Sequence, residues 1–313
     1  VGRPSRYLGT QLSTLLLAHS PGLWSISTVI YPIPYVEFYI TNVCNLACSG
    51  CNRFNNLDFR GWQRWSDWSN DYAHWARILQ PQRIGVLGGE PTLNPTLLDW
   101  LQGTRALWPR PEIKVTTNGT RLQHMAHLYE FAVNDPNFVL WISVHNKQHK
   151  RDLMAQLQAW MTAPLNYDYD GSNPYLQVVT VTDARGVRAK FEYNWWFHQG
   201  ALQRTETGVT LHRSDANKAH AICHMRECHT FYQGKLYKCG VVAVLPELDR
   251  QHPLELDARQ RSVLDSVSAL NYRDSAERQR DFLAHLADPV PQCEFCPEQY
   301  QGQQIAALYK KEL

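Results

Sequence analysis

Three cysteines in a C-x3-C-x2-C spacing, Cys44, Cys48 and Cys51, are the residues of this chain whose chemistry is easiest to predict. Three thiolates on one short loop can hold three irons of a [4Fe–4S] cube. A cluster that serves only electron transfer normally has four cysteine ligands. The spacing therefore indicates a cluster with one iron left open for another ligand, and a zinc site is the alternative.

Two glycine-containing motifs follow the cysteines, each at the end of an apolar, strand-like run. Residues 84–87 lead into Gly88-Gly89-Glu90-Pro91, and residues 113–115 lead into Thr116-Thr117-Asn118-Gly119. Glycine lets the backbone approach a ligand closely, and a carboxylate can pair with an ammonium group. Taken singly, each motif is equally compatible with an ordinary strand-to-helix turn.

The three motifs in this order resemble those of the radical S-adenosylmethionine (SAM) superfamily. In that family the open iron chelates SAM, and an electron from the cluster cleaves SAM to a 5′-deoxyadenosyl radical. The resemblance implies that the glycine-rich motif contacts the SAM amino group and that the second motif also lines the cofactor site. The expected cofactor-binding residues are Gly88, Gly89, Glu90, Pro91, Thr117 and Asn118.

Further cofactor contacts are implied by the same resemblance. The run 138–144 ends in Ser143-Val144-His145, and in relatives this strand end supplies polar contacts to SAM, so Ser143 is expected to bind it. His145 would share the face of Ser143 and is a candidate substrate contact or general base; a partly exposed histidine at a strand tip is the alternative. Relatives often have an aromatic residue where Gly50 stands, and Phe54 is the candidate to replace it beside the adenine.

A second set of cysteines lies in the C-terminal part of the chain. Residues 228–239 predict a β-hairpin, because two apolar pairs flank a Gln233-Gly234 turn. A two-residue loop places Cys228 opposite Cys239 with Cβ atoms about 5 Å apart, so both thiolates could reach one metal centre. The five candidate ligands are Cys223, Cys228, Cys239, Cys293 and Cys296.

The spacing C-x10-G-x4-C, counted from Cys223, resembles the auxiliary-cluster motif of SPASM and twitch domains. The cysteine count matches the smaller twitch form, which has one auxiliary [4Fe–4S] cluster; zinc is the alternative. If each of the four irons has one cysteine ligand, one of the five cysteines is left over, either Cys223 or Cys228. In related epimerases a spare cysteine donates a hydrogen atom, whereas related dehydrogenases pass an electron to the auxiliary cluster. A small buried side chain is the alternative for that cysteine.

Strands and helices are expected to alternate from residue 35 onward. The first helix has the clearest period, with aromatic side chains at three- and four-residue steps that predict a buried face rather than a substrate platform. Its members are Trp62, Trp65, Trp68, Tyr72, Trp75 and Leu79. The expected strands are 35–41, 83–88, 112–117, 138–144 and 175–182, and the expected helices are 62–80, 96–108, 121–134 and 150–162.

This alternation predicts an α/β fold with a parallel sheet covered by helices, and the family resemblance narrows it to a partial (β/α)6, TIM-like barrel. A sixth strand is not evident in 184–213. The fifth strand offers Thr180, Thr182 and Asp183 near its end, where such barrels have their chemistry. The expected units are an N-terminal extension (1–34), the barrel (35–213), a small cysteine-rich α+β twitch domain with a β-hairpin (214–300) and a tail (301–313).

Both ends of the chain favour short helices. One is expected near residues 11–19. The other is an amphipathic helix over 299–313, with Ile305, Leu308 and Tyr309 on one side.

Bulk properties exclude few classes of function. A length of 313 residues suits about two domains, and a net charge of +2 gives no argument for nucleic acid or membrane as a partner. No apolar run is long enough to span a bilayer or to act as a secretion signal. Eight cysteines in a chain of this size favour metal ligation in a reducing, cytoplasmic compartment over disulfides.

The favoured prediction is a radical SAM oxidoreductase or epimerase that abstracts hydrogen from a small polar substrate such as a sugar, cyclitol or nucleoside. It would need SAM, two [4Fe–4S] clusters and an electron donor of the flavodoxin or ferredoxin type. The first alternative is a maturase of a ribosomally synthesised peptide, although residues 1–34 are short for the leader-binding segment that such enzymes often carry. The second is a non-catalytic iron–sulfur or zinc protein that serves as a redox sensor or scaffold.

Overall fold

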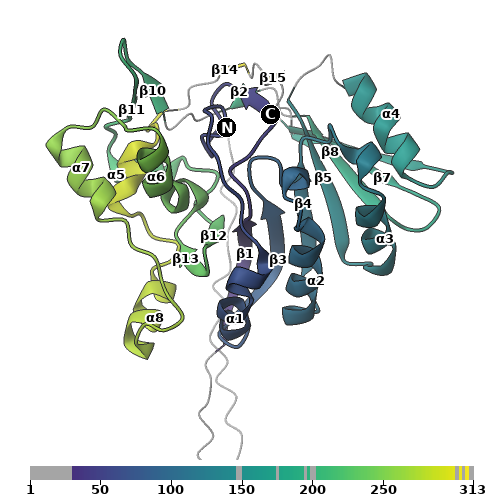
Figure 1. The fold of residues 1–313 in the computed structure, drawn as a ribbon, viewed down its shortest axis with the longest axis horizontal. Helices are drawn as coiled ribbons and strands as arrows, with labels where there is room; N and C mark the ends of the chain where they lie inside the picture. The colour runs from purple at the N-terminus through teal and green to yellow at the C-terminus, as the bar shows by residue number, and fades with distance from the viewer. Residues whose placement is uncertain are drawn as a thin grey trace, which may run out of the picture.

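The centre of the fold is a mixed α/β arrangement around one nine-stranded sheet (Figure 1). The structure is a computed structural model that describes residues 30–145, 150–173, 176–193, 196–197, 202–299, 303–304 and 307–309. The helix expected near residues 11–19 lies outside these ranges. Among the described residues, no helix is both long and apolar enough to cross a membrane.

The strand order of the sheet is β13-β12-β1-β3-β4-β5-β8-β7-β6, and the six strands from β12 to β8 run parallel. The parallel strands are β12 (His229–Tyr232), β1 (Tyr31–Tyr39), β3 (Leu79–Leu87), β4 (Glu112–Thr117), β5 (Phe138–Val144) and β8 (Arg188–Tyr193). The antiparallel edges are β13 (Lys235–Tyr237), β7 (Leu176–Thr182) and β6 (Asn166–Asn173).

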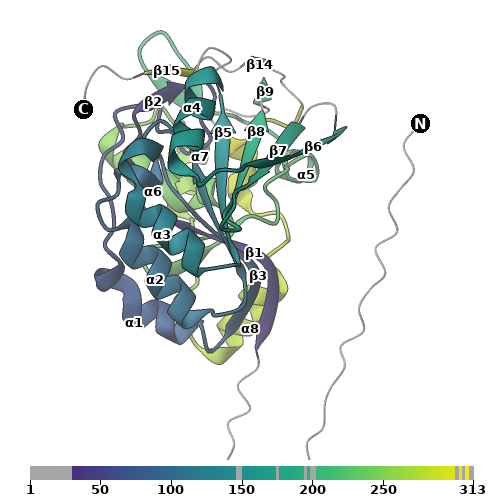
Figure 2. The ribbon, with the colours of Figure 1, turned by 90° about the vertical axis from the view of Figure 1, so that its right-hand side faces the viewer.

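Helices cover one face of this sheet (Figure 2). They are α1 (Trp65–Trp75), α2 (Leu97–Leu107), α3 (Ala126–Asn134) and α4 (Lys150–Trp160), with 3-10 turns at Pro91–Leu93 and Leu122–His124. The C-terminal part adds α5 (Ala216–Ala221), α6 (Gly240–Gln251), α7 (Ala258–Asp265), α8 (Ala276–Ala284) and a 3-10 turn at Pro291–Phe295. The predicted strand–helix alternation over residues 35–162 is therefore confirmed.

Alternation along the strands separates the two faces of the sheet. Phe38 on β1 faces the helices and packs in an aromatic cluster with Tyr72, Trp100 and Phe231. Intervening residues point to the opposite side, which we call the inner face. Its polar and aromatic members on β1, β4, β5 and β8 include Tyr35, Glu37, Glu112, Lys114, Thr116, Trp141, Ser143, Arg188, Lys190 and Glu192.

The aromatic stripe of the first helix lies largely in the core, as predicted. Tyr72 and Trp75 are fully buried, and Trp65 and Trp68 pack against the same cluster, whereas Trp62 is 40% exposed. The helix ends at Trp75 rather than at residue 80, since the chain has already entered β3 by residue 79.

The strand at 175–182 is present, but its predicted role as a fifth parallel strand is wrong. β7 runs antiparallel to β8, and only residues 183–187 connect the two strands. A connection this short can join antiparallel neighbours, whereas a parallel crossover needs a dozen residues or more. The fifth strand of the chain to enter the parallel array is β8, which lies in the region where no strand was evident from the sequence.

The amphipathic helix expected over 299–313 is also wrong for the described part of that segment. β15 (Ala307–Tyr309) pairs antiparallel with β2 (Leu46–Cys48), and β14 (Gln303–Gln304) pairs with β9 (Trp196–Phe197). These ladders give the backbone polar groups partners that the sequence pattern does not reveal. A further small hairpin joins β10 (Leu202–Arg204) to β11 (Val209–Leu211).

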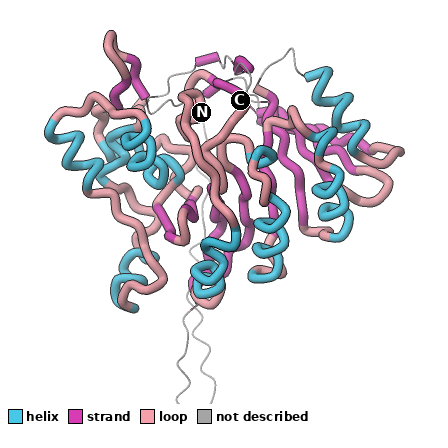
Figure 3. The backbone as a smooth tube through the Cα atoms, in the orientation of Figure 1, coloured by secondary structure: helices cyan, strands magenta, loops and turns pink. Residues whose placement is uncertain are grey.

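The predicted hairpin over residues 228–239 is confirmed (Figure 3). β12 and β13 flank Gln233 and Gly234, which both have positive φ, as a tight two-residue hairpin turn requires. β12 also pairs in parallel with β1, so the main sheet extends past residue 214. The division into barrel and twitch units remains a proposal.

Candidate functional site

The three sequence motifs meet at one edge of the sheet. β1, β3 and β4 are neighbours and run parallel, and each is followed directly by one motif. The carboxyl ends of parallel strands lie at the same edge, where ligands bind in α/β folds. Segments more than seventy residues apart along the chain, such as Asn45 and Asn118, thereby come into contact.

The cysteine loop forms a small cluster of its own. Cys44 and Cys48 are buried together with Leu46, and the half-buried Cys51 packs against them. Backbone contacts shape the loop: the N–H of Cys51 donates to the carbonyl of Cys48 (3.3 Å), and the N–H of Leu46 donates to Sγ of Cys44 (3.4 Å). β15 pairs with the segment that contains Cys48, so the tail lies beside this loop (Figure 1).

Glu90 joins the glycine-rich motif to the end of β4. Its fully buried carboxylate accepts from the N–H and hydroxyl of Thr92 (3.1 and 2.6 Å), the hydroxyl of Thr117 (2.6 Å) and the N–H of Asn118 (2.7 Å). Burial raises the pKa of Glu90, while these four donors oppose the rise. Three of the donors reach Oε1 and one reaches Oε2, and through them Glu90 holds two loops together.

Asn118 extends this network to the cysteine loop. Its amide donates to Oδ1 of Asn45 (2.8 Å), and the amide of Asn45 donates to the hydroxyl of Thr120 (2.8 Å). Thr120 in turn donates to Oδ1 of Asn118 (2.7 Å). The three motifs are therefore interlocked by direct hydrogen bonds.

Gly88 and Gly89 allow the motif backbone to lie directly against the chain that leads into Cys44. A Cβ on Gly88 would be 2.5 Å from the carbonyl oxygen of Thr41, and one on Gly89 would overlap the carbonyl of Val43. The N–H groups of Gly89 and Glu90 donate to those two carbonyls at 2.7 and 2.8 Å. The glycines were expected to let the backbone approach a ligand closely. In the structure they let it approach the segment that carries the cysteines.

The other predicted SAM contacts have different outcomes. Ser143 lies half-buried on the inner face, beside Glu192 in the strand register. Phe54 is fully buried in a second hydrophobic cluster with Tyr39, so it has no exposed ring surface for an adenine in this structure. Burial lowers the pKa of His145 to about 4, so His145 is neutral at pH 7.

The strand end near residue 183 lies away from the motifs. Because β7 is antiparallel to β8, Thr180, Thr182 and Asp183 approach the opposite edge of the sheet. Asp183 accepts from the hydroxyl of Tyr129 (2.6 Å) and from the N–H of Thr162 (3.0 Å). Its role is structural, and the predicted placement of these residues at the site is wrong.

Four of the C-terminal cysteines affect one another electrostatically. Burial raises the pKa of Cys296 well above its ordinary value, and Cys239, Cys223 and Cys293 add to the rise. Burial also raises the pKa of Cys293, and Cys239 and Cys223 contribute. These four thiols, which come from three separate segments, therefore lie near one another.

Cys228 lies on the inner face, and of the four cysteines above only Cys223 contributes to its raised pKa. It precedes β12 by one residue and shares a face with Thr230, which pairs with Glu37, so it belongs to the inner face. Burial and then Glu37 raise the pKa of Cys228 to about 12, while Arg53 and Lys114 oppose the rise.

Arg53 is a site residue that the sequence interpretation missed. It lies two residues after Cys51 and forms a buried ion pair with Glu37. A Cβ on Gly240, the residue after Cys239, would overlap its guanidinium. Nε of Arg53 has no hydrogen-bond partner within the described part of the chain. Arg53 thus connects the two cysteine sets, and no spacing pattern marks it.

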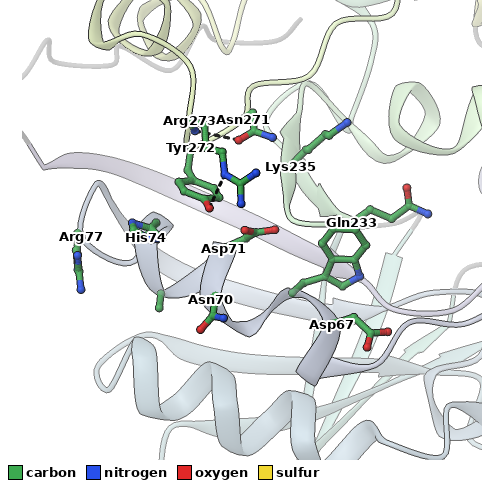
Figure 4. Close-up of a pocket in the computed structure, with 12 residues that line it drawn as sticks. Asp67, Asn70, Asp71, His74, Arg77, Gln233, Lys235, Asn271, Tyr272 and Arg273 are labelled. Carbon is green, nitrogen blue, oxygen red and sulfur yellow. Dashed lines mark hydrogen bonds between the residues drawn. The ribbon is translucent and has the colours of Figure 1, made fainter.

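A separate polar cleft lies between α1 and the hairpin (Figure 4). It has a volume of about 720 Å³, and Asp71, His74 and Tyr272 are among its lining residues. None of the predicted site residues lines it. The cleft is therefore distinct from the candidate site.

The two cysteine groups differ in position but offer the same kind of metal ligand. Both cysteine groups offer sulfur ligands only, which suits iron–sulfur clusters. Within the described ranges, no three His, Cys, Asp or Glu side chains meet closely enough to hold a single metal ion. An all-cysteine donor set suits zinc as well as an iron–sulfur cluster.

Comparisons with known proteins give weak similarity only. No family model and no curated protein matches the chain. The crystal structure of Streptococcus suis SuiB bound to S-adenosylmethionine is 20% identical with a TM-score of 0.31, over 39% of this chain and 28% of SuiB. SuiB bound to its precursor peptide SuiA is 15% identical with a TM-score of 0.26, over 42% of this chain and 37% of SuiB. The match thus spans well under half of SuiB, and TM-scores of this size carry no argument.

Proposed function

We propose that this chain is a radical SAM enzyme. The supporting observation is the hydrogen-bonded network in which Asn45, Glu90 and Asn118 interlock the three motifs at the carboxyl ends of β1, β3 and β4. Loops that follow neighbouring parallel strands meet at one edge in any such sheet, so the side-chain hydrogen bonds between the motifs support the proposal more than their position does. A non-catalytic cluster protein would have no use for this network beside its cysteines.

The residues that would hold the first cofactor are Cys44, Cys48 and Cys51, which leave one iron of a [4Fe–4S] cluster open for SAM. When bound, the cluster supplies the electron that cleaves SAM to a 5′-deoxyadenosyl radical, which abstracts hydrogen from the substrate. We assign Glu90 to positioning, since its carboxylate already accepts four hydrogen bonds. The backbone of residues 88–91 and the side chain of Ser143 are the proposed SAM contacts.

We assign the auxiliary [4Fe–4S] cluster to Cys223, Cys239, Cys293 and Cys296, because Cys239 contributes to the raised pKa of each of the other three thiols. This choice leaves Cys228 as the spare thiol of a twitch-like unit. Lys238 is buried beside this group, and its ammonium donates to the carbonyl of Leu286 at 2.6 Å. Its positive charge would partly balance the thiolates.

The position of Cys228 favours epimerisation over dehydrogenation. A thiol on the inner face can give its hydrogen atom to a substrate carbon radical. The sulfur then needs one electron and one proton, which the reducing system that drives the reaction supplies. His145 remains a candidate substrate contact; a pKa of about 4 makes it a weak base.

The polar inner face suits a small polar substrate such as a sugar, cyclitol or nucleoside. Peptide modification is the second candidate, and a labelled peptide distinguishes it from the first. A flavodoxin or ferredoxin is the proposed electron donor, and a cytoplasmic location would keep the clusters reduced.

Anaerobic, reconstituted protein incubated with SAM and dithionite tests the proposal. We expect 5′-deoxyadenosine from the wild type and none from the Cys44→Ala/Cys48→Ala/Cys51→Ala variant. Failure of the wild type to form 5′-deoxyadenosine under any condition would favour a redox or scaffold protein. Deuterium transfer into 5′-deoxyadenosine from a labelled sugar or from a labelled peptide would distinguish the two substrate classes.

A further inference from the structure

The inner face carries two cations around one indole ring. Nζ of Lys114 lies 4.6 Å from the ring centroid of Trp141, and Nζ of Lys190 lies 5.3 Å from it. The lysines come from β4 and β8, the strands on either side of β5. Both side chains are half-buried, so solvent screens their mutual repulsion less than it would at the surface.

The carboxylates of the inner face are engaged elsewhere. Glu37 pairs with Arg53. Glu192 accepts from the indole N–H of Trp141, a neutral donor that leaves the charge of Glu192 in place. Within the part of the chain that the structure describes, neither Lys114 nor Lys190 forms an ion pair.

Other acidic groups near this region do not neutralise the lysines either. Glu112 faces Arg188 at 3.7 Å. Asp168 lies on the exposed edge strand β6 and is separated from Lys190 by Thr180 in the register. Among the described residues, no carboxylate therefore lies within ion-pair distance of Lys114 or Lys190.

A third group beside the lysines also lacks a partner. Thr116, Trp141 and Lys190 form one row across β4, β5 and β8. The hydroxyl of Thr116 is buried and has no hydrogen-bond partner among the described residues. A buried hydroxyl of this kind indicates a missing donor or acceptor.

We propose that Lys114 and Lys190, with Trp141 and Thr116 between them, bind an anionic group of the substrate, either a carboxylate or a phosphate. This inference rests on the proposed function, in which the inner face receives the substrate. Ammonium groups form strong charge-assisted hydrogen bonds with such anions. Lys114 also acts electrostatically on Cys228, so the anion site and the spare thiol share one face.

The site is distinct from the place proposed for SAM. Ser143 pairs with Glu192, and Trp141 pairs with Lys190 one inner-face step further from the carboxyl ends. Two residues of a strand correspond to about 7 Å. Lys190 therefore lies one layer below the SAM contacts, and Lys114, which pairs with Val139, lies two layers below them.

Equilibrium dialysis of the anaerobic, reconstituted full chain tests this site, with [32P]phosphate and [14C]acetate as the two probes. We expect saturable binding of at least one probe. The probe that binds with the higher affinity identifies the anionic group as a phosphate or a carboxylate. Lys114→Met and Lys190→Met should each weaken that binding about tenfold or more, as loss of a charge-assisted hydrogen bond does. Lys235→Met, at an exposed lysine of the hairpin, is the matched control and should bind like the wild type.

Two outcomes would overturn the inference. One is binding that is absent or unchanged in Lys114→Met and Lys190→Met. The other is competitive displacement of the probe by SAM, which would make the lysines part of the SAM site. The same samples are assayed for 5′-deoxyadenosine. A wild type that forms it but binds no anion at the lysines refutes this inference alone, whereas anion binding without 5′-deoxyadenosine refutes the proposed function alone.

Discussion

Gly89→Ala is the substitution that most directly separates the cysteine loop from the glycine-rich motif. The added Cβ would overlap the carbonyl oxygen of Val43 and stand 2.9 Å from Cβ of Cys44, where ordinary contact begins near 3.4 Å. Both neighbours are main chain or lie next to it, so no flexible side chain can turn away. The chain that leads into Cys44 must move.

The cost of that movement follows from the contacts that hold the two segments together. Overpacking costs about 1–3 kcal/mol, and two backbone hydrogen bonds are at risk, from Gly89 to Thr41 (2.7 Å) and from Glu90 to Val43 (2.8 Å). Each contributes about 1 kcal/mol. We expect a loss of roughly 2–4 kcal/mol in the free energy of unfolding, together with loss of iron from the N-terminal cluster.

Anaerobic urea unfolding and iron analysis measure the two effects. Gly186→Ala is the control: Gly186, unlike Gly89, has a positive φ, +82°, but its Cβ would meet nothing within 4 Å. The Gly186→Ala variant should lose about 1–2 kcal/mol in the free energy of unfolding, from backbone strain alone, and should keep all of its iron. The reasoning is refuted if Gly89→Ala matches Gly186→Ala in both measurements.

Four further predictions concern the cysteine sets and their surroundings. Cys223→Ser should lose the iron of the auxiliary cluster, whereas Cys228→Ser should keep it and lose substrate turnover. Arg53→Met should lower the free energy of unfolding by about 3–5 kcal/mol in urea titrations, because it leaves the buried Glu37 carboxylate unpaired. Lys238→Met should lower the reduction potential of the auxiliary cluster in an EPR-monitored titration, because it removes a buried positive charge beside the thiolates. The pKa of His145 is about 4 in the folded protein, below its ordinary 6.5. The contribution of His145 to the free energy of unfolding is therefore fully present above pH 6.5 and is lost as the pH falls towards 4. Between pH 7.5 and pH 5, the free energy of unfolding should therefore fall by about 1–2 kcal/mol less in His145→Gln than in the wild type.

Each of these predictions has a matched comparison. Equal iron loss in both cysteine variants would contradict the assignment of Cys228 as the spare thiol. Arg53→Lys keeps the charge and should recover part of the stability; no recovery would show that packing against Gly240 dominates. Lys235→Met should leave the potential unchanged. His127→Gln, at an exposed histidine, should follow the pH dependence of the wild type, and the same behaviour in His145→Gln would contradict its burial.

The parallel core of the fold could be predicted because its signals are local. Apolar runs ending in Gly88 and Thr116 mark buried strands, and the aromatic period over residues 65–75 marks a helix with one buried face. The direction of β7 could not be predicted in the same way. Its alternating pattern fits either direction, and only the length of the connection to β8 decides between them.

The tail shows why long-range pairing escapes sequence interpretation. The spacing of Ile305, Leu308 and Tyr309 suits one helix face, yet the described residues 307–309 form a strand because β2 offers an unpaired edge. Tertiary pairing overrides local pattern in short segments.

The site was predictable in its motifs and not in its connections. Cys44, Glu90 and Asn118 belong to recognisable patterns, but the hydrogen bonds from Thr117 and Asn118 to the Glu90 carboxylate depend on the fold. Arg53 and the lysine pair around Trp141 belong to no motif. Their roles follow from which face of each strand they occupy.

The open iron at Cys44, Cys48 and Cys51 is the central claim, and EPR spectroscopy of the reduced protein with and without SAM tests it most directly. To isolate this cluster, the spectra are recorded on Cys223→Ser, which should lack the auxiliary cluster. The account predicts a [4Fe–4S] signal whose g-values shift when SAM is added, and no such signal after Cys44, Cys48 and Cys51 are replaced by alanine. A [4Fe–4S] signal that SAM leaves unchanged, or one stoichiometric zinc and no iron at these cysteines, would contradict it.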